Sequence, residues 1–136
     1  MTKRNTSRKF AAFALYQAEI RQKDITDILT DYLEDRRILP DTKNFADELA
    51  LKAWKNQKAS DEIIIKYAKN WEFSRINALD KCILRLALYE IRFTETPVKI
   101  VLNEAIEIAK KYSSDDAPKF INGILNAFIK QECLLV

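Results

Sequence analysis

The chain has 136 residues, 48% of them hydrophobic and 32% charged, which predicts one domain over residues 1–136 with an ample core. One glycine and three prolines are too few for the tight turns of an all-β or α/β fold, so an all-α protein is expected. The absence of histidine removes the commonest general base, and a single glycine excludes a phosphate loop or dinucleotide fingerprint. No apolar run approaches the roughly 18 residues of a membrane span, and no signal-peptide pattern opens the chain, so a cytoplasmic location is expected.

Apolar residues at helical spacing predict six or seven helices with short connections. The first starts near residue 6 or 7, and the second follows a cap at Asp24 and ends before Pro40. A third runs from about residue 42 and bends near 58–60, where a fourth begins. Two more cover 74–93 and 97–112, and the last is capped by Ser114 or Asp115 with Pro118 in its first turn.

The segment 74–93 is the predicted central helix, because residues 82–88 are apolar nearly all round. Trp54 and Trp71 also fall at inward helical positions, and core packing is the favoured interpretation for both. Because Trp71 ends its helix, partial exposure beside a partner site is the alternative.

Gly123, the only glycine, stands in an Asn-Gly pair that usually marks a hairpin, yet its neighbours follow helical spacing. A glycine inside a helix costs about 1 kcal/mol relative to alanine. We therefore expect another helix, the first or the central one, to approach closely at Gly123. Asn122 would bond to an otherwise unpaired backbone group there.

Charge is unevenly distributed. The first 18 residues carry four bases and no acid, whereas residues 19–51 carry nine acids against five bases. This pattern indicates that a polyanion meets one face only. The basic arm consists of Lys3, Arg4, Arg8 and Lys9, and a second basic group consists of Lys110, Lys111 and Lys119. The two groups would merge into one surface if the last helix packed beside the first.

Tyr16 lies two turns beyond Arg8 and could offer its ring to unpaired bases. A solubilising terminus with a half-buried tyrosine is the alternative interpretation. Glu104 and Glu107 share a helix face, but pairing of Glu107 with Lys110 or Lys111 is favoured over an acid/base or metal role. Neither cysteine has metal or redox spacing, and no cofactor is expected.

Four stretches together carry a family resemblance: "ALYQ" at 14–17, "DKCILRLALYEI" at 80–91, "NEAIEIAKKY" at 103–112 and "KFINGIL" at 119–125. In this order and spacing the chain resembles the NusB transcription antitermination factor family over about residues 7–129. The resemblance implies a compact bundle of about seven helices in two subdomains and no catalysis. It implies binding of boxA-type single-stranded RNA beside ribosomal protein NusE, within the RNA polymerase antitermination complex that supports ribosomal RNA transcription.

Carried over position by position, the resemblance places Lys3, Arg4, Arg8, Tyr16, Asp116, Lys119 and Phe120 on the RNA side. It places Ala68, Ser74 and Asp80 on the NusE side. Asn5, Thr6 and Ser7 interrupt the arginine cluster that many relatives have, so weak affinity for RNA alone is expected. Ala68 and Ser74 also offer less side chain than some relatives. The alternative function is a homodimeric protein-interaction module without a direct RNA role.

Overall fold

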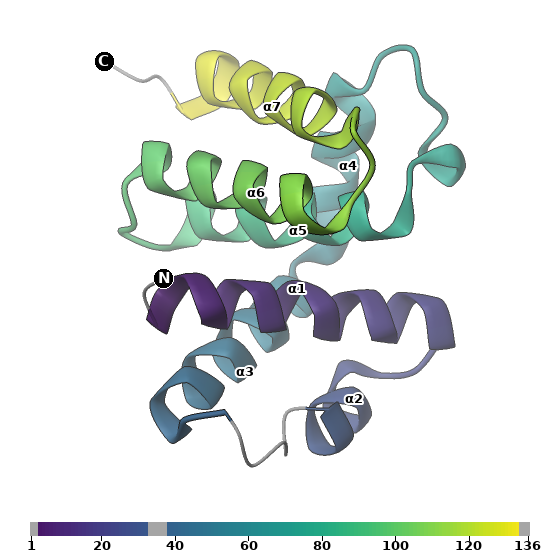
Figure 1. Cartoon of the computed structure of the whole chain (residues 1–136). Helices are drawn as coiled ribbons and strands as arrows, with labels where there is room; N and C mark the ends of the chain where they lie inside the picture. The colour runs from purple at the N-terminus through teal and green to yellow at the C-terminus, as the bar shows by residue number, and fades with distance from the viewer. Residues whose placement is uncertain (1–2, 33–37, 134–136) are drawn as a thin grey trace.

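The computed structural model describes residues 3–32 and 38–133, and these ranges form seven α-helices without a strand (Figure 1). The predicted all-α class is therefore confirmed. The helices are α1 (Lys3–Arg21), α2 (Ile25–Tyr32), α3 (Pro40–Lys55), α4 (Gln57–Tyr67), α5 (Ala78–Phe93), α6 (Val98–Tyr112) and α7 (Ala117–Phe128). A 3-10 turn, η1 (Phe73–Arg75), precedes α5, and a π-helical turn, η2 (Ile129–Cys133), follows α7.

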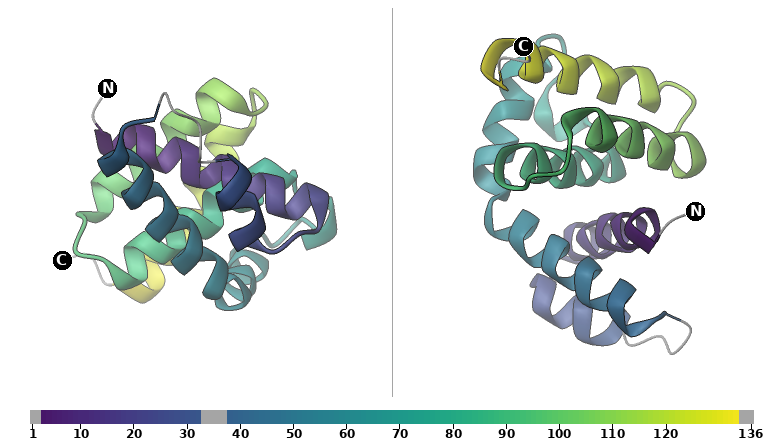
Figure 2. Two further views of the ribbon diagram at one scale, coloured as in Figure 1. Left: turned by 90° about the horizontal axis from the view of Figure 1, so that it is seen from below. Right: turned by 90° about the vertical axis from the view of Figure 1, so that its left-hand side faces the viewer.

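The helices form two groups that face each other across α1 and α5. Figure 2 shows α1, α2 and α3 in one group and α4 to α7 in the other, with α3 leading into α4 along one side. The most extensive packing is that of α1 on α3 and on α5, and of α6 on α5 and α7. The two-subdomain architecture predicted for the fold is thus observed.

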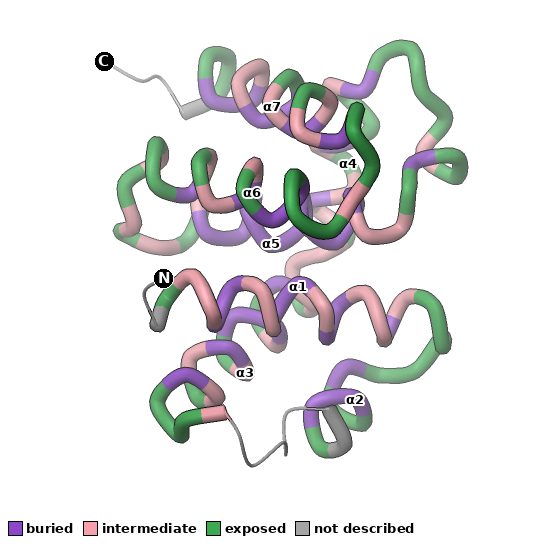
Figure 3. The backbone as a smooth tube through the Cα atoms, viewed as in Figure 1, coloured by how far each residue is buried: buried purple, intermediate pink, exposed green. Residues whose placement is uncertain are grey.

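The central helix is α5, as predicted, and every residue from Asp80 to Glu90 is buried (Figure 3). Its start is fixed by Asn77, whose side-chain oxygen accepts hydrogen bonds from the backbone N–H groups of Leu79 (2.9 Å) and Asp80 (3.3 Å). Burial on all sides follows from the position of α5 between α1 and α6. Its four buried charged residues therefore need partners within the protein.

Several helix ends are at or close to the predicted positions. The side chain of Asp24 accepts from the backbone N–H of Thr26 at 2.9 Å, which caps α2 as expected. The predicted bend at 58–60 is a break at Asn56, where α3 ends and α4 begins. The expected cap of α7 by Ser114 or Asp115 is wrong, because the helix starts after Asp116 and has no side-chain cap.

The prediction of a close helix approach at Gly123 is wrong. Gly123 is exposed on α7, and a Cβ built there would meet no atom within 4 Å outside its own helix backbone and neighbours. Asn122 does not bond to a backbone group either, since its Oδ1 accepts from Nδ2 of Asn126 at 2.8 Å. Gly123 is therefore not a packing joint, and its lack of a side chain weakens the helix without compensation.

The guess that α7 packs beside α1 is also wrong. α7 packs on α4, α5 and α6, and α6 lies between α7 and α1 in Figures 1 and 2. A continuous basic surface that joined the basic arm to Lys119 would therefore have to cross α6.

Candidate nucleic-acid interface

Arg4, at the start of α1, is an exposed cation held in place by an aromatic ring. Its guanidinium carbon lies 3.8 Å from the ring centroid of Phe45 on α3. A guanidinium stacked on a ring still presents its N–H donors at the edge of its plane, where they can contact phosphate. The geometry of Arg4 is compatible with its predicted RNA role. The side chain of Lys3 lies outside the described part of the structure.

Arg8 is different, because its side chain is used inside the protein. The residue is only 4% exposed, and its Nε and a terminal nitrogen donate to the two carboxylate oxygens of Glu90 at 2.8 and 3.0 Å. This bidentate pair joins α1 to the central helix α5. The prediction that Arg8 binds phosphate does not fit this geometry, since the guanidinium is enclosed and already paired.

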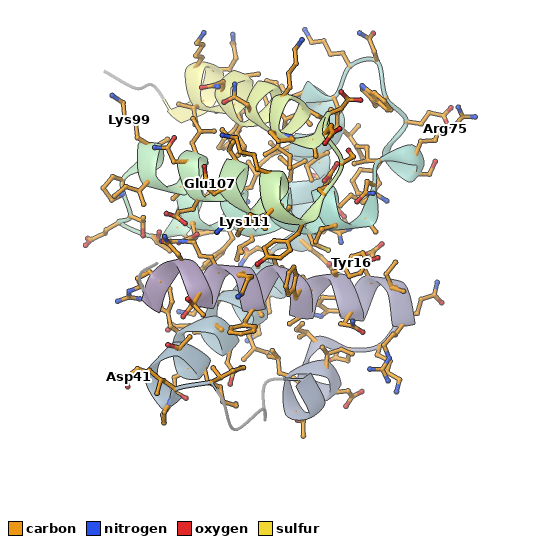
Figure 4. All side chains as sticks on the ribbon, in the orientation of Figure 1. Tyr16, Asp41, Arg75, Lys99, Glu107 and Lys111 are labelled. Carbon is orange, nitrogen blue, oxygen red and sulfur yellow. The ribbon has the colours of Figure 1, made fainter. Side chains whose placement is uncertain are left out.

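The seam between α1 and α6 combines rings and cations. Phe13 and Tyr112 meet edge to face with ring centroids 4.9 Å apart. Beside them a hollow of about 240 Å³ is lined by Lys9 of α1 and Lys111 of α6, and also by the acidic pair Glu104 and Glu107 of α6. Figure 4 shows Tyr16 on α1 and Lys111 on α6, the two helices at the front of the view. Tyr16 is half-buried against the core, so only part of its ring is available to a base.

Glu104 and Glu107, the acidic pair on α6, interact with basic residues of the protein itself. Glu107 lies 3.8 Å from Nζ of Lys110, as the favoured interpretation predicts. Burial raises the pKa of Glu104, and the positive charge of Arg8 opposes that rise. Within residues 3–32 and 38–133, no three potential ligand residues gather in a way that could hold a metal ion. Burial also raises the pKa of the Cys82 thiol to about 12, which makes it unreactive.

The start of α7 presents the remaining predicted RNA-side residues. Asp116 and Lys119 are exposed, and the side chain of Asp116 makes no capping bond. Phe120 is half-buried and contacts Trp71 with ring centroids 5.6 Å apart. Exposed cations therefore occur on three of the helices at the front of Figure 1: Arg4 at the start of α1, Lys110 and Lys111 at the end of α6, and Lys119 in the first turn of α7.

Of the three predicted partner-side residues, only Ser74 is exposed. Ala68 is buried at the end of α4, and Asp80 is 5% exposed with its carboxylate accepting from the Ser113 hydroxyl at 2.6 Å. Desolvation raises the pKa of Asp80, and the bond from Ser113 only partly offsets it. Direct side-chain contacts by Ala68 and Asp80 do not fit this structure, because both residues lie beneath the surface.

An ion cluster centred on the buried Arg85 was missed by the sequence interpretation. Arg85 of α5 donates to both carboxylate oxygens of Asp61 at 2.7 and 2.9 Å, and to Glu19 at 2.8 Å. It thereby connects α5 to α4 and to α1. The signal was available, since Arg85 and Glu90 are charges inside a nearly all-apolar helix and such charges require partners.

Two helical groups packed through a buried central helix, with cations and rings on α1, α6 and the start of α7, define a class: a small helical-bundle protein whose surface chemistry suits RNA. Comparison with protein-family models identifies the family. Residues 5–130 match the NusB family, and the chain belongs to it.

Known relatives match along nearly the whole chain. The transcription antitermination protein NusB of Thermoanaerobacter sp. (strain X514) is 35% identical over 131 residues, which cover 96% of this chain and 93% of that protein. The structure of T. maritima NusB superposes with a TM-score of 0.87 and 34% identity, covering 96% of this chain and 93% of the other. A crystal structure of antitermination factors NusB and NusE in complex with dsRNA contains a chain with a TM-score of 0.86 and 26% identity, covering 96% and 98% respectively. No helix in the described ranges combines the length and apolarity needed to cross a membrane.

Proposed function

We propose that this protein is a transcription antitermination factor that binds boxA-type single-stranded RNA together with ribosomal protein NusE. In this role it would join the RNA polymerase antitermination complex and support ribosomal RNA transcription. It would work in the cytoplasm by binding, without catalysis.

The observation that carries the proposal is the full-length likeness to a NusB chain solved with NusE and RNA. The surface chemistry of this chain supports it. Arg4, Lys111 and Lys119 are exposed cations on α1, α6 and α7, and Phe120 of α7 offers part of a ring next to Lys119 in the chain. Cations bind phosphates without regard to sequence, and rings stack on unpaired bases.

The test is a gel shift of a boxA-type RNA with this protein, with and without its cognate NusE. We expect weak binding by this protein alone and tighter binding when NusE is present. A duplex of the same sequence provides the comparison between single-stranded and double-stranded RNA. Absence of binding to either RNA, even with NusE, would overturn the proposal. Light scattering would then show whether the protein forms a homodimer that RNA never dissociates.

A salt series locates the phosphate contacts. Each of Arg4→Gln, Lys111→Gln and Lys119→Gln should reduce the slope of log K against log salt by about 0.7, the value for one contact on a single strand. Lys58→Gln is the matched control, because Lys58 is an exposed lysine on α4, at the back of Figure 1. An equal loss of slope in the control would show that these residues act only through net charge.

A further inference from the structure

Trp71 lies on the surface rather than in the core, contrary to the favoured interpretation of its sequence position. It follows α4, is 56% exposed, and its backbone N–H donates to the carbonyl of Ala68 at 3.1 Å. Its ring packs against Phe120 of α7 at an interplanar angle of 68°. Because this is an edge contact, much of the indole surface remains open to solvent beside an RNA-side residue of the proposed function.

A hollow of about 210 Å³ opens between these two rings. Pockets for drug-sized ligands usually enclose about 300–1,000 Å³. The hollow is therefore suited to a single planar group, such as one nucleobase. It lies where the turn after α4, the start of α5 and the start of α7 meet.

The polar side chains in the wall of the hollow, apart from Arg75, are those of Asn77, Asp80, Ser114 and Asp116. Asp80 accepts from the Ser113 hydroxyl, whereas Asn77 and Asp116 offer a donor and an acceptor that the fold leaves unused. Oδ1 of Asn77 is committed to capping α5, which directs its Nδ2 amide elsewhere. That amide has no hydrogen-bond partner in the described ranges of the chain. Asp116 also lines the hollow, is exposed, and makes no capping bond. A carboxylate acceptor next to an amide donor can read the edge of an unpaired base.

Arg75 supplies a cation at the same place. Its side chain is highly exposed, and its contact with the exposed carboxylate of Glu72 is long, at 3.7 Å. A surface ion pair of this kind contributes little and holds the guanidinium only loosely. Arg75 can therefore contact a phosphate on either side of a base bound in the hollow.

We propose that Trp71, Phe120, Asn77 and Asp116 form a pocket for one unpaired RNA base, and that Arg75 binds an adjacent phosphate. The inference rests on the proposed function and extends it to residues on the α4–α5 connection. Asp116 accepts hydrogen bonds and cannot donate one, so the bound base must turn an N–H group toward it, either an exocyclic amino group or the N3–H of uracil.

The test uses the full chain, a boxA-type single-stranded RNA and cognate NusE. Trp71→Ala should weaken RNA binding by about 5-fold to 150-fold, the range for loss of one base–aromatic stack. Asn77→Asp keeps the capping oxygen and removes the amide donor, so it should weaken binding without loss of fold. Phe93→Ala is the control, since Phe93 is a similarly exposed aromatic on α5 that does not line the hollow, and it should bind as the wild type does.

Tryptophan fluorescence provides a readout that does not depend on Trp71→Ala folding. The chain has two tryptophans, and RNA should quench the emission of the wild type but not that of Trp71→Phe, which retains only Trp54. The RNA can also be scanned by removing each base in turn. At one position the loss of the base should weaken binding by the wild type but not by Trp71→Ala.

The outcomes separate this inference from the function on which it rests. If the wild type binds RNA but Trp71→Ala binds equally well and no quenching occurs, the base pocket is refuted and the function stands. If Trp71→Ala loses NusE and retains RNA, the hollow receives a protein side chain, which also refutes the pocket. If the wild type binds no RNA with or without NusE, both fail together.

Discussion

Replacement of Arg8 tests whether this arginine is a structural residue or an RNA ligand. Arg8→Met removes the only ion-pair partner that the described structure provides for Glu90, which is 1% exposed. Loss of one member of a buried ion pair typically costs about 3–5 kcal/mol, because an uncompensated charge remains in the interior. We therefore expect Arg8→Met to lower the free energy of unfolding by about that amount. A domain with a typical stability of about 5–15 kcal/mol would lose a large part of it.

The double variant Arg8→Met/Glu90→Leu shows where the cost arises. It replaces both charges by apolar groups of similar size, and such exchanges are often neutral or stabilising. Urea unfolding followed by circular dichroism should show the single variant destabilised and the double variant close to wild type. The salt slope of RNA binding, measured for the double variant, should equal that of the wild type.

Two results would refute this reasoning. If Arg8→Met unfolds within about 0.5 kcal/mol of wild type, Glu90 must be reached by water or by another partner. If the stable double variant loses about 0.7 of the salt slope, Arg8 contacts phosphate after all. The first result tests the structural role of the Arg8–Glu90 pair, and the second tests whether Arg8 contacts RNA. Either claim can be refuted while the other stands.

Further variants test the glycine, the buried carboxylate and the ion cluster. Gly123→Ala should stabilise the protein by up to about 1 kcal/mol in thermal unfolding, because the site has room for a methyl group and alanine favours the helix. A melting temperature below that of the wild type would refute this prediction. Asp80→Asn should be more stable than wild type at pH 7, since the raised pKa of Asp80 means that folding disfavours its charge. The gap should close as pH falls through that pKa and the carboxyl is protonated, and a gap that widens in acid would contradict the assignment. Arg85→Met should cost more in urea unfolding than Lys52→Ala. Arg85 is buried and bonded to Asp61 and Glu19, whereas the 2.6 Å pair of Lys52 with Glu48 is exposed and should contribute under about 1 kcal/mol. Equal losses would show that burial of the cation does not determine the contribution of its ion pairs.

The sequence alone was informative about helices and about the family. Asp24 and Pro97 mark helix starts through local chemistry, and the apolar stretch at 82–88 identifies the central helix. Pro40 is expected from the sequence to break the second helix, and in the structure it is the first residue of α3. These features are predictable because helical periodicity and capping depend on residues within a few positions of one another. The order and spacing of the four motifs likewise indicate the family, because both are read directly from the sequence.

Tertiary packing decided what each surface residue can do. In the sequence, Arg8 resembles a free cation of the basic arm. In the structure, its guanidinium is buried and paired with the carboxylate of Glu90, which lies 82 residues further along the chain. Trp71 has the spacing of a core residue, yet the chain turns after α4 and leaves it beside Phe120 on the surface. Gly123 suggests a close contact that the actual position of α7 on α6 does not create. Helix periodicity defines faces, but the neighbour that each face meets depends on long-range packing, and this determines which cations and rings remain available to RNA.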